Sequence, residues 1–162
     1  MSKSLHSPEE LRALAAATGV EALLHRAERP MPTVEEAAAA LSLPITAMTK
    51  NIVFLVSDAA VLAIATGQSR IDDRALARHF GVGRKRVGLA APDRAYALSG
   101  FVIGCMPSFG HRAALPTLID PAVMALDRVY GGTGDPRVLI SLAPADLVRL
   151  TDGSVVSLSH TV

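Results

Sequence analysis

The chain has 162 residues, a formal net charge of +1 and a single cysteine, and half of its residues are hydrophobic. This length is typical of one domain, 1–162, whose core can form without a disulfide or metal to stabilise it. One cysteine excludes an intrachain disulfide and a cysteine-based zinc site, and the near-neutral charge excludes a general nucleic-acid-binding protein.

The first half of the chain carries clear capping and turn signals. Ser7 and Glu10 form a capping box before one helix, and Thr33 and Glu36 form a second before an alanine-rich helix. The link 57–60 between two apolar runs is short enough for a hairpin. In chain order we predict a helix over 8–17, a strand over 21–26, a helix over 34–41, strands over 48–56 and 61–66, and a helix over 71–80 that is capped by Asp72.

The second half mixes short strands with short helices. In chain order we predict a short strand or extended segment over 86–90, one or two helical turns over 92–98, a strand over 101–103 and an extended segment over 115–119. After these we predict a short helix or turn that opens at 120–121, strands over 128–130 and 137–142, a helix over 144–150 and a strand over 155–158. Helices and strands do not alternate strictly. This pattern indicates an α+β fold with a mixed, mainly antiparallel sheet flanked by helices.

Lys50 is unusual because it is a cation inside an apolar strand. Since side chains alternate along a strand, it shares a face with Met48, Ile52 and Phe54. A lysine in that place must reach water, bind an anion or lose its charge. Two interpretations stay open on the spacing alone: a pocket cation that binds a phosphate or carbonyl, and a strand-end lysine whose stem extends to solvent.

The loop 104–110 is the second candidate. Two glycines flank a proline directly after a predicted strand, which exposes backbone N–H groups that could hold a carbonyl or carboxylate, although a tight connection without a ligand has the same pattern. Cys105 and His111 could act as a thiol nucleophile and its base, but a small buried cysteine is the commoner case. Asp120 could cap a turn or line a pocket.

Positive charge is concentrated in one region of the chain. Three arginines precede a contiguous basic run, and the six residues are Arg70, Arg74, Arg78, Arg84, Lys85 and Arg86. Such a patch could hold a phosphate backbone with salt-sensitive affinity, or it could be a solvated helix face. The five histidines have no metal-ligand spacing, so we predict no metal site.

The order and spacing of several short segments resemble the YbaK/ProX family of aminoacyl-tRNA editing domains. The resemblance runs from about Glu21 to the C-terminus, and no single motif carries it. The segments are 48–54, 69–72, 99–104, Pro107, 109–111, 115–116, 119–120 and 140–142. Cys105 stands where relatives have a second glycine and Ser108 where they have a proline, so substrate identity is less well indicated than the reaction.

This resemblance implies a compact α+β domain around a partly barrel-like sheet that removes wrong amino acids from tRNA by hydrolysis. Lys50 matches the family's essential strand lysine. The substrate-binding residues that we predict with it are Asn51, Gly104, Cys105, Met106, Pro107, Ser108, Gly110, His111 and Asp120. We add three tRNA contacts on the basis of charge: Arg84, Lys85 and Arg86.

We therefore predict a free-standing, cytoplasmic trans-editing hydrolase that needs no cofactor or metal and selects its substrate by size. Loop N–H groups would stabilise the oxyanion, and the ribose hydroxyl would help to position water. The favoured substrate is alanine or 2-aminobutyrate on proline tRNA, and serine or cysteine are the alternative amino acids. A second hypothesis is a module that binds tRNA or a synthetase without hydrolysis. A third is an unrelated thiol enzyme that uses Cys105. Predicted partners are mischarged tRNA and a prolyl-tRNA synthetase or elongation factor, with no membrane.

Overall fold

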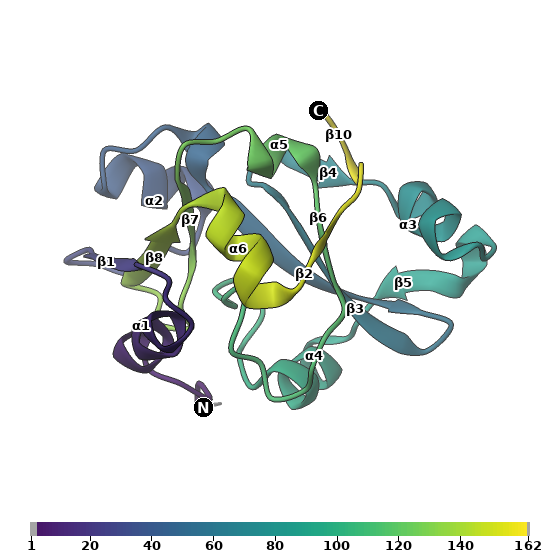
Figure 1. Ribbon diagram of the computed structural model, residues 1–162, viewed down its shortest axis with the longest axis horizontal. Helices are drawn as coiled ribbons and strands as arrows, with labels where there is room; N and C mark the ends of the chain where they lie inside the picture. Colours follow the sequence, from purple (N-terminus) through teal and green to yellow (C-terminus); the bar gives the residue numbers. More distant parts are fainter. Residues whose placement is uncertain (1–2, 162) are drawn as a thin grey trace.

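The computed structural model describes residues 3–161 (Figure 1). The helices within this range are α1 (Pro8–Ala17), α2 (Val34–Ala40), α3 (Asp73–Phe80), α4 (Pro92–Ser99), α5 (Pro121–Met124) and α6 (Pro144–Thr151), with short 3-10 turns at Ile45–Ala47 and Arg84–Arg86. The strands are β1 (Leu23–Arg26), β2 (Thr49–Val56), β3 (Ala59–Thr66), β4 (Ser69–Ile71), β5 (Val87–Leu89), β6 (Thr117–Ile119), β7 (Val129–Gly132), β8 (Val138–Leu142), β9 (Ser154–Val155) and β10 (Ser159–Thr161).

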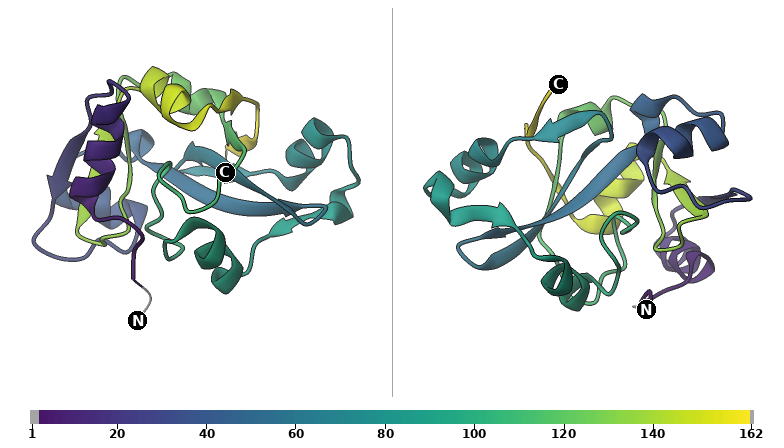
Figure 2. Two further views of the ribbon diagram at one scale, coloured as in Figure 1. Left: turned by 60° about the horizontal axis from the view of Figure 1, so that its bottom comes forward. Right: turned by 180° about the vertical axis from the view of Figure 1, so that it is seen from behind.

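The long hairpin of β2 and β3 forms the centre of the fold (Figures 1 and 2). Its sheet has the order β5-β2-β3-β6-β9, with β3 and β5 antiparallel to β2 and with β6 and β9 added in parallel. A second, antiparallel sheet has the order β1-β8-β7, and a bridge between Met48 and Tyr130 joins it to the start of β2. The predicted mixed, mainly antiparallel α+β fold is therefore confirmed.

The central hairpin has a tighter turn than the sequence predicted. Ser57 and Asp58 both have positive φ, 48° and 70°, as a two-residue type I′ turn requires. Ala59 and Ala60 belong to β3 and pair with Val56 and Leu55. The predicted four-residue link was too long because two alanines carry no strand signal of their own.

Three other predicted boundaries are wrong. Residues 101–103 do not form a strand, because the chain turns at Gly100 (φ 84°) and the buried Ser99 hydroxyl accepts a hydrogen bond from the N–H of Phe101. The predicted helix over 71–80 begins at Asp73, and residues 69–71 form β4 instead. Of the predicted strand over 155–158 only Val155 lies in a strand, β9, and β10 begins after it at Ser159.

The core lies on both faces of β3. Leu62 and Ile64 pack into the larger cluster with Leu11, Phe101 and Ile119. The alternate residues of β3 pack into a second cluster whose buried members are Phe54, Val56, Val61, Ala63, Leu76, Leu118 and Leu158. Because full burial of a leucine contributes about 1.5–3 kcal/mol, this two-sided packing fixes the register of the hairpin. No helix within residues 3–161 combines the length and apolar character needed to span a bilayer.

Candidate active site

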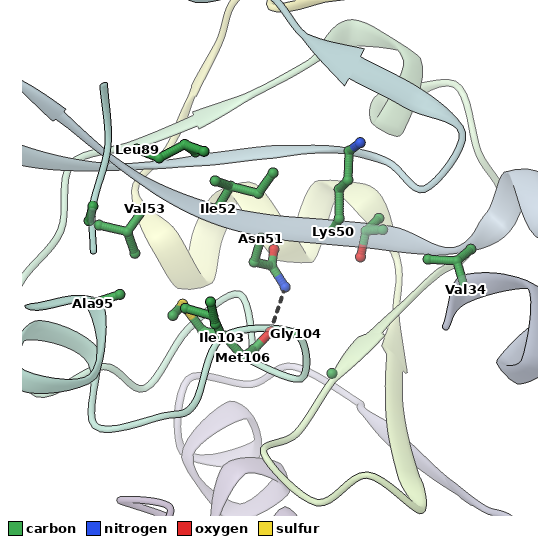
Figure 3. A pocket seen from close by; sticks show the side chains of 13 residues that line it. Val34, Lys50, Asn51, Ile52, Val53, Leu89, Ala95, Ile103, Gly104 and Met106 are labelled. Carbon is green, nitrogen blue, oxygen red and sulfur yellow. Dashed lines mark hydrogen bonds between the residues drawn. The ribbon is translucent and has the colours of Figure 1, made fainter. Parts of the chain in front are cut away.

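A cavity of about 390 Å³ lies along β2, between that strand and the loop that follows α4 (Figure 3). Its polar side chains gather at the start of β2, where Thr49, Lys50 and Asn51 are consecutive, and most of the remaining wall is apolar. The lining residues are Val34, Thr49, Lys50, Asn51, Ile52, Val53, Leu89, Ala90, Ala95, Ile103, Gly104, Met106 and Gly132. A ligand with one polar and one apolar end fits such a cavity.

Asn51 connects β2 to the loop of residues 104–108 by two hydrogen bonds. Its Nδ2 donates a hydrogen bond to the carbonyl oxygen of Met106 over 2.9 Å (Figure 3). Its Oδ1 accepts a hydrogen bond from Oγ of Ser108, also over 2.9 Å. Because a carbonyl oxygen can only accept, the Met106 contact fixes the orientation of the amide. These contacts make Asn51 a positioning residue for the loop.

Loss of the Ser108 hydroxyl should weaken this attachment. Ser108→Ala removes the donor to Oδ1 of Asn51 in a part-buried place, so we expect the free energy of unfolding to fall by about 1 kcal/mol. Urea denaturation measures this change. Ser157→Ala is the matched control, since Ser157 is exposed. Equal stability of the two variants would contradict the proposed attachment.

Strand β7 holds the same loop from the other side. The N–H of Gly134 donates a hydrogen bond to the carbonyl oxygen of Cys105 over 2.6 Å. A Cβ placed on Gly132 would lie 2.5 Å from that oxygen and 3.1 Å from the carbonyl oxygen of Met106. Only glycine permits so close a backbone approach. The loop is thus held between Asn51 of β2 on one side and, on the other, Gly132 at the end of β7 and Gly134 just after it.

Lys50 lies on the opposite side of β2 from Asn51, and its ammonium points away from the loop of Gly104 and Met106 (Figure 3). The side chain is half-buried and lines both the cavity and a neighbouring hollow that contains Arg70. Burial lowers the pKa of Lys50 below its usual value, and the positive charge of Arg70 lowers it further. No ion pair among residues 3–161 includes Lys50.

Cys105 does not have the surroundings of a thiolate nucleophile. Burial raises the pKa of its thiol, and the charge of Asp135 raises it further, whereas a reactive cysteine needs a lowered pKa. Its Sγ lies 3.5 Å from the carbonyl oxygen of Gly134. His111 is committed elsewhere, because its Nε2 donates to the carbonyl oxygen of Pro107 over 2.7 Å. Burial lowers the pKa of His111, which favours the neutral ring.

Asp120 lies away from the cavity in a structural role. It is 5% exposed, and its Oδ1 accepts the N–H of Ala122 at the start of α5. Its Oδ2 accepts three hydrogen bonds of 2.9 Å, from the N–H groups of Leu158 and Ser159 and from the Ser159 hydroxyl. These bonds hold the chain where it passes from β9 to β10. The structure thus brings Lys50, Asn51, Gly104 and Met106 to the cavity, but not Asp120.

The remaining predicted residues lie around this cavity rather than in it. Ser108, Gly110 and His111 line a separate hollow behind the loop, and Pro107 contacts His111. Arg84, Lys85 and Arg86 form an exposed 3-10 turn before β5, of which only Arg84 reaches the hollow beside Lys50.

Most residues of the cavity wall were not predicted from the sequence. Ile52, Val53 and Leu89 were predicted only as parts of extended segments, and Gly132 as part of a glycine turn of a kind that can also line a site. Apolar lining residues cannot be distinguished from core residues by pattern alone. Gly132 did carry a signal, because a glycine beside another glycine at the end of a strand often marks the close approach of a second backbone.

Comparisons with known proteins place the whole cavity in a shared region. The model of the aminoacyl-tRNA editing domain family matches residues 28–150. A crystal structure of a proposed trans-editing enzyme for prolyl-tRNA synthetase is 26% identical with a TM-score of 0.84, and the match covers 96% of this chain and 99% of that one. A scaffold protein from a study of computational epitope grafting is 25% identical with a TM-score of 0.83, covering 97% and 100% of the chains. The hypothetical protein APE2540, 24% identical with a TM-score of 0.85 over 93% and 99% of the chains, shares the fold.

Proposed function

The chain belongs to the aminoacyl-tRNA editing domain family, and on this premise we propose that it is a free-standing deacylase that hydrolyses the ester between a wrong amino acid and its tRNA. The cavity along β2 carries this proposal. It joins a polar end, formed by three consecutive β2 residues, to an apolar wall, and the clamped loop 104–106 closes it. An aminoacyl ester of the terminal ribose has the same combination of polar and apolar parts.

The loop supplies the groups that such a reaction needs. Gly104 and Met106 line the cavity, and within residues 3–161 neither of their N–H groups donates a hydrogen bond to another backbone group. Such donors, held rigidly at a cavity wall, can stabilise the oxyanion that forms when water attacks the ester carbonyl. Collapse of that intermediate breaks the bond to the ribose oxygen, which leaves as the protonated hydroxyl, and releases the free amino acid. Because the ester is already reactive, this route requires no cysteine nucleophile.

Size selection is the proposed basis of specificity. The wall opposite the polar end contains Ile52, Val53 and Met106, which limit the length and width of the bound side chain. We propose alanine or 2-aminobutyrate as the amino acid, with serine and cysteine as the alternatives. Proline tRNA is the first tRNA to test, because the 26% identical structure is described as a proposed trans-editing enzyme for prolyl-tRNA synthetase.

A deacylation panel tests this function. The protein is mixed with alanyl-tRNA, seryl-tRNA and cysteinyl-tRNA, including alanine on proline tRNA, and release of labelled amino acid is followed. We expect hydrolysis of at least one of these esters above the rate without protein, and we expect Cys105→Ala to retain it, which a thiol enzyme could not. Binding of tRNA without hydrolysis of any ester would overturn the deacylase and select a binding module.

A further inference from the structure

A second hollow adjoins the cavity on the far side of Lys50. Lys50, Ile52 and Leu89 line both spaces, so the two hollows adjoin each other along β2 and β5. The residues that line the second hollow are Lys50, Ile52, Phe54, Arg70, Ile71, Asp72, Asp73, Arg74, Arg84 and Leu89. Its charged groups come from β2, β4, α3 and the turn before β5, which makes it a feature of the folded sheet rather than of one flexible segment.

Positive charge predominates in this hollow. Four cations face two carboxylates, and one of these carboxylates, Asp73, is paired with Arg84 over 3.2 Å. The other, Asp72, accepts the backbone N–H of Arg74 as the cap of α3. Lys50, Arg70 and Arg74 take part in no ion pair among residues 3–161. Three cations on rigid elements therefore lack a partner of opposite charge in the described part of the chain.

The arrangement of Lys50 and Arg70 favours a bound anion. The two side chains share the hollow, and Lys50 is partly removed from water, so their repulsion is screened less than it would be at an open surface. Burial lowers the pKa of Lys50, and the repulsion from Arg70 lowers it further. An anion between the two cations removes the repulsion, and arginine is well suited to bind phosphate oxygens in pairs.

We propose that the second hollow binds the phosphates of the single-stranded 3′ end of tRNA, with Arg70 and Arg74 as its main contacts. This inference rests on the proposed function. If the terminal ribose ester occupies the cavity, the nucleotides before it must leave through an adjoining opening, and Lys50 stands where the two spaces join. Lys85 and Arg86 do not line the hollow, so the path differs from the contiguous basic run that the sequence suggested.

Binding of uncharged proline tRNA tests this proposal without any hydrolysis. The dissociation constant is measured by fluorescence anisotropy over a series of salt concentrations. We expect Arg70→Gln and Arg74→Gln each to weaken binding about tenfold. Each substitution should also reduce the slope of log K against log salt by about 0.7, the value for one lost phosphate contact on a single strand. Arg70→Lys keeps the charge and should restore the slope.

Two matched variants separate the hollow from general charge. Arg78 lies on α3, as Arg74 does, but lines a different hollow, and Lys85 belongs to the contiguous basic run. Arg78→Gln and Lys85→Gln should each change affinity less than twofold, well below the effect of losing a charged hydrogen bond. Equal losses in all four glutamine variants, or an unchanged slope in Arg70→Gln and Arg74→Gln, would overturn the proposal. Thermal unfolding measurements check that each variant is folded. If Arg70→Gln does not fold, the affinity and salt dependence of Arg74→Gln test the proposal.

Discussion

Lys50→Ala is expected to lower kcat/KM for a mischarged tRNA by about a hundredfold, the size of effect seen when one electrostatic group is removed from an enzyme site. Three residues line both the cavity and the basic hollow: Lys50, Ile52 and Leu89. Of these three, only Lys50 carries a charge. If it anchors a phosphate in the ground state, most of the loss should fall on KM; if it acts only in the transition state, the loss should fall on kcat.

Stability separates this chemical role from a structural one. Because the pKa of Lys50 is lowered in the folded protein, the charged lysine destabilises the fold at neutral pH, and raising the pH through its folded pKa removes that cost. Lys50→Ala should therefore not lower the free energy of unfolding at pH 7. Lys85→Ala, at an exposed position outside both spaces, is the control for loss of charge. Full deacylase activity of Lys50→Ala would contradict the role.

The sequence correctly predicted features that depend on contacts between neighbouring residues, such as helix caps. The capping box of Ser7 and Glu10 forms as predicted, and Asp72 caps α3 by accepting the N–H of Arg74. Where the prediction was wrong, the cause is a distant partner. The strand expected over 155–158 ends early because the N–H of Leu158 turns to Asp120, 38 residues away. A pattern confined to neighbouring residues cannot contain that information.

Only part of the candidate site was predicted from the sequence, and the directions of its side chains were not. Strand alternation placed Lys50 on the face of Ile52 and Phe54, and both residues line the hollow with it. The same alternation puts Asn51 on the other face of β2. Which of the two faces the loop 104–108 covers depends on the pairing of β7 with β8 and on the contact of β7 with the loop. For that reason strand alternation alone could not show that Asn51, and not Lys50, is the residue that contacts the loop.

Gly132→Ala is expected to destabilise the site because the added methyl group would overlap the backbone of the loop. The added Cβ would lie 2.5 Å from the carbonyl oxygen and 2.7 Å from the carbonyl carbon of Cys105. These are backbone atoms, so no side-chain rotation relieves the contact, and the loop must move away from β7. We expect the free energy of unfolding to fall by about 1–3 kcal/mol, as for other overpacked sites. Displacement of the loop by about 1 Å should also lower kcat/KM for a mischarged tRNA by up to about a hundredfold.

Gly88→Ala is the matched control for this substitution. Gly88 also lies in a strand, β5, and a Cβ there would meet no atom within 4 Å. Neither glycine has a positive φ, so alanine is compatible with both backbones and the comparison isolates the steric contact. Gly88→Ala should change the free energy of unfolding by no more than about 0.5 kcal/mol. If Gly132→Ala matched it in urea denaturation and in deacylation, the loop would not be clamped against β7, and the oxyanion role of its N–H groups would lose its rigid support.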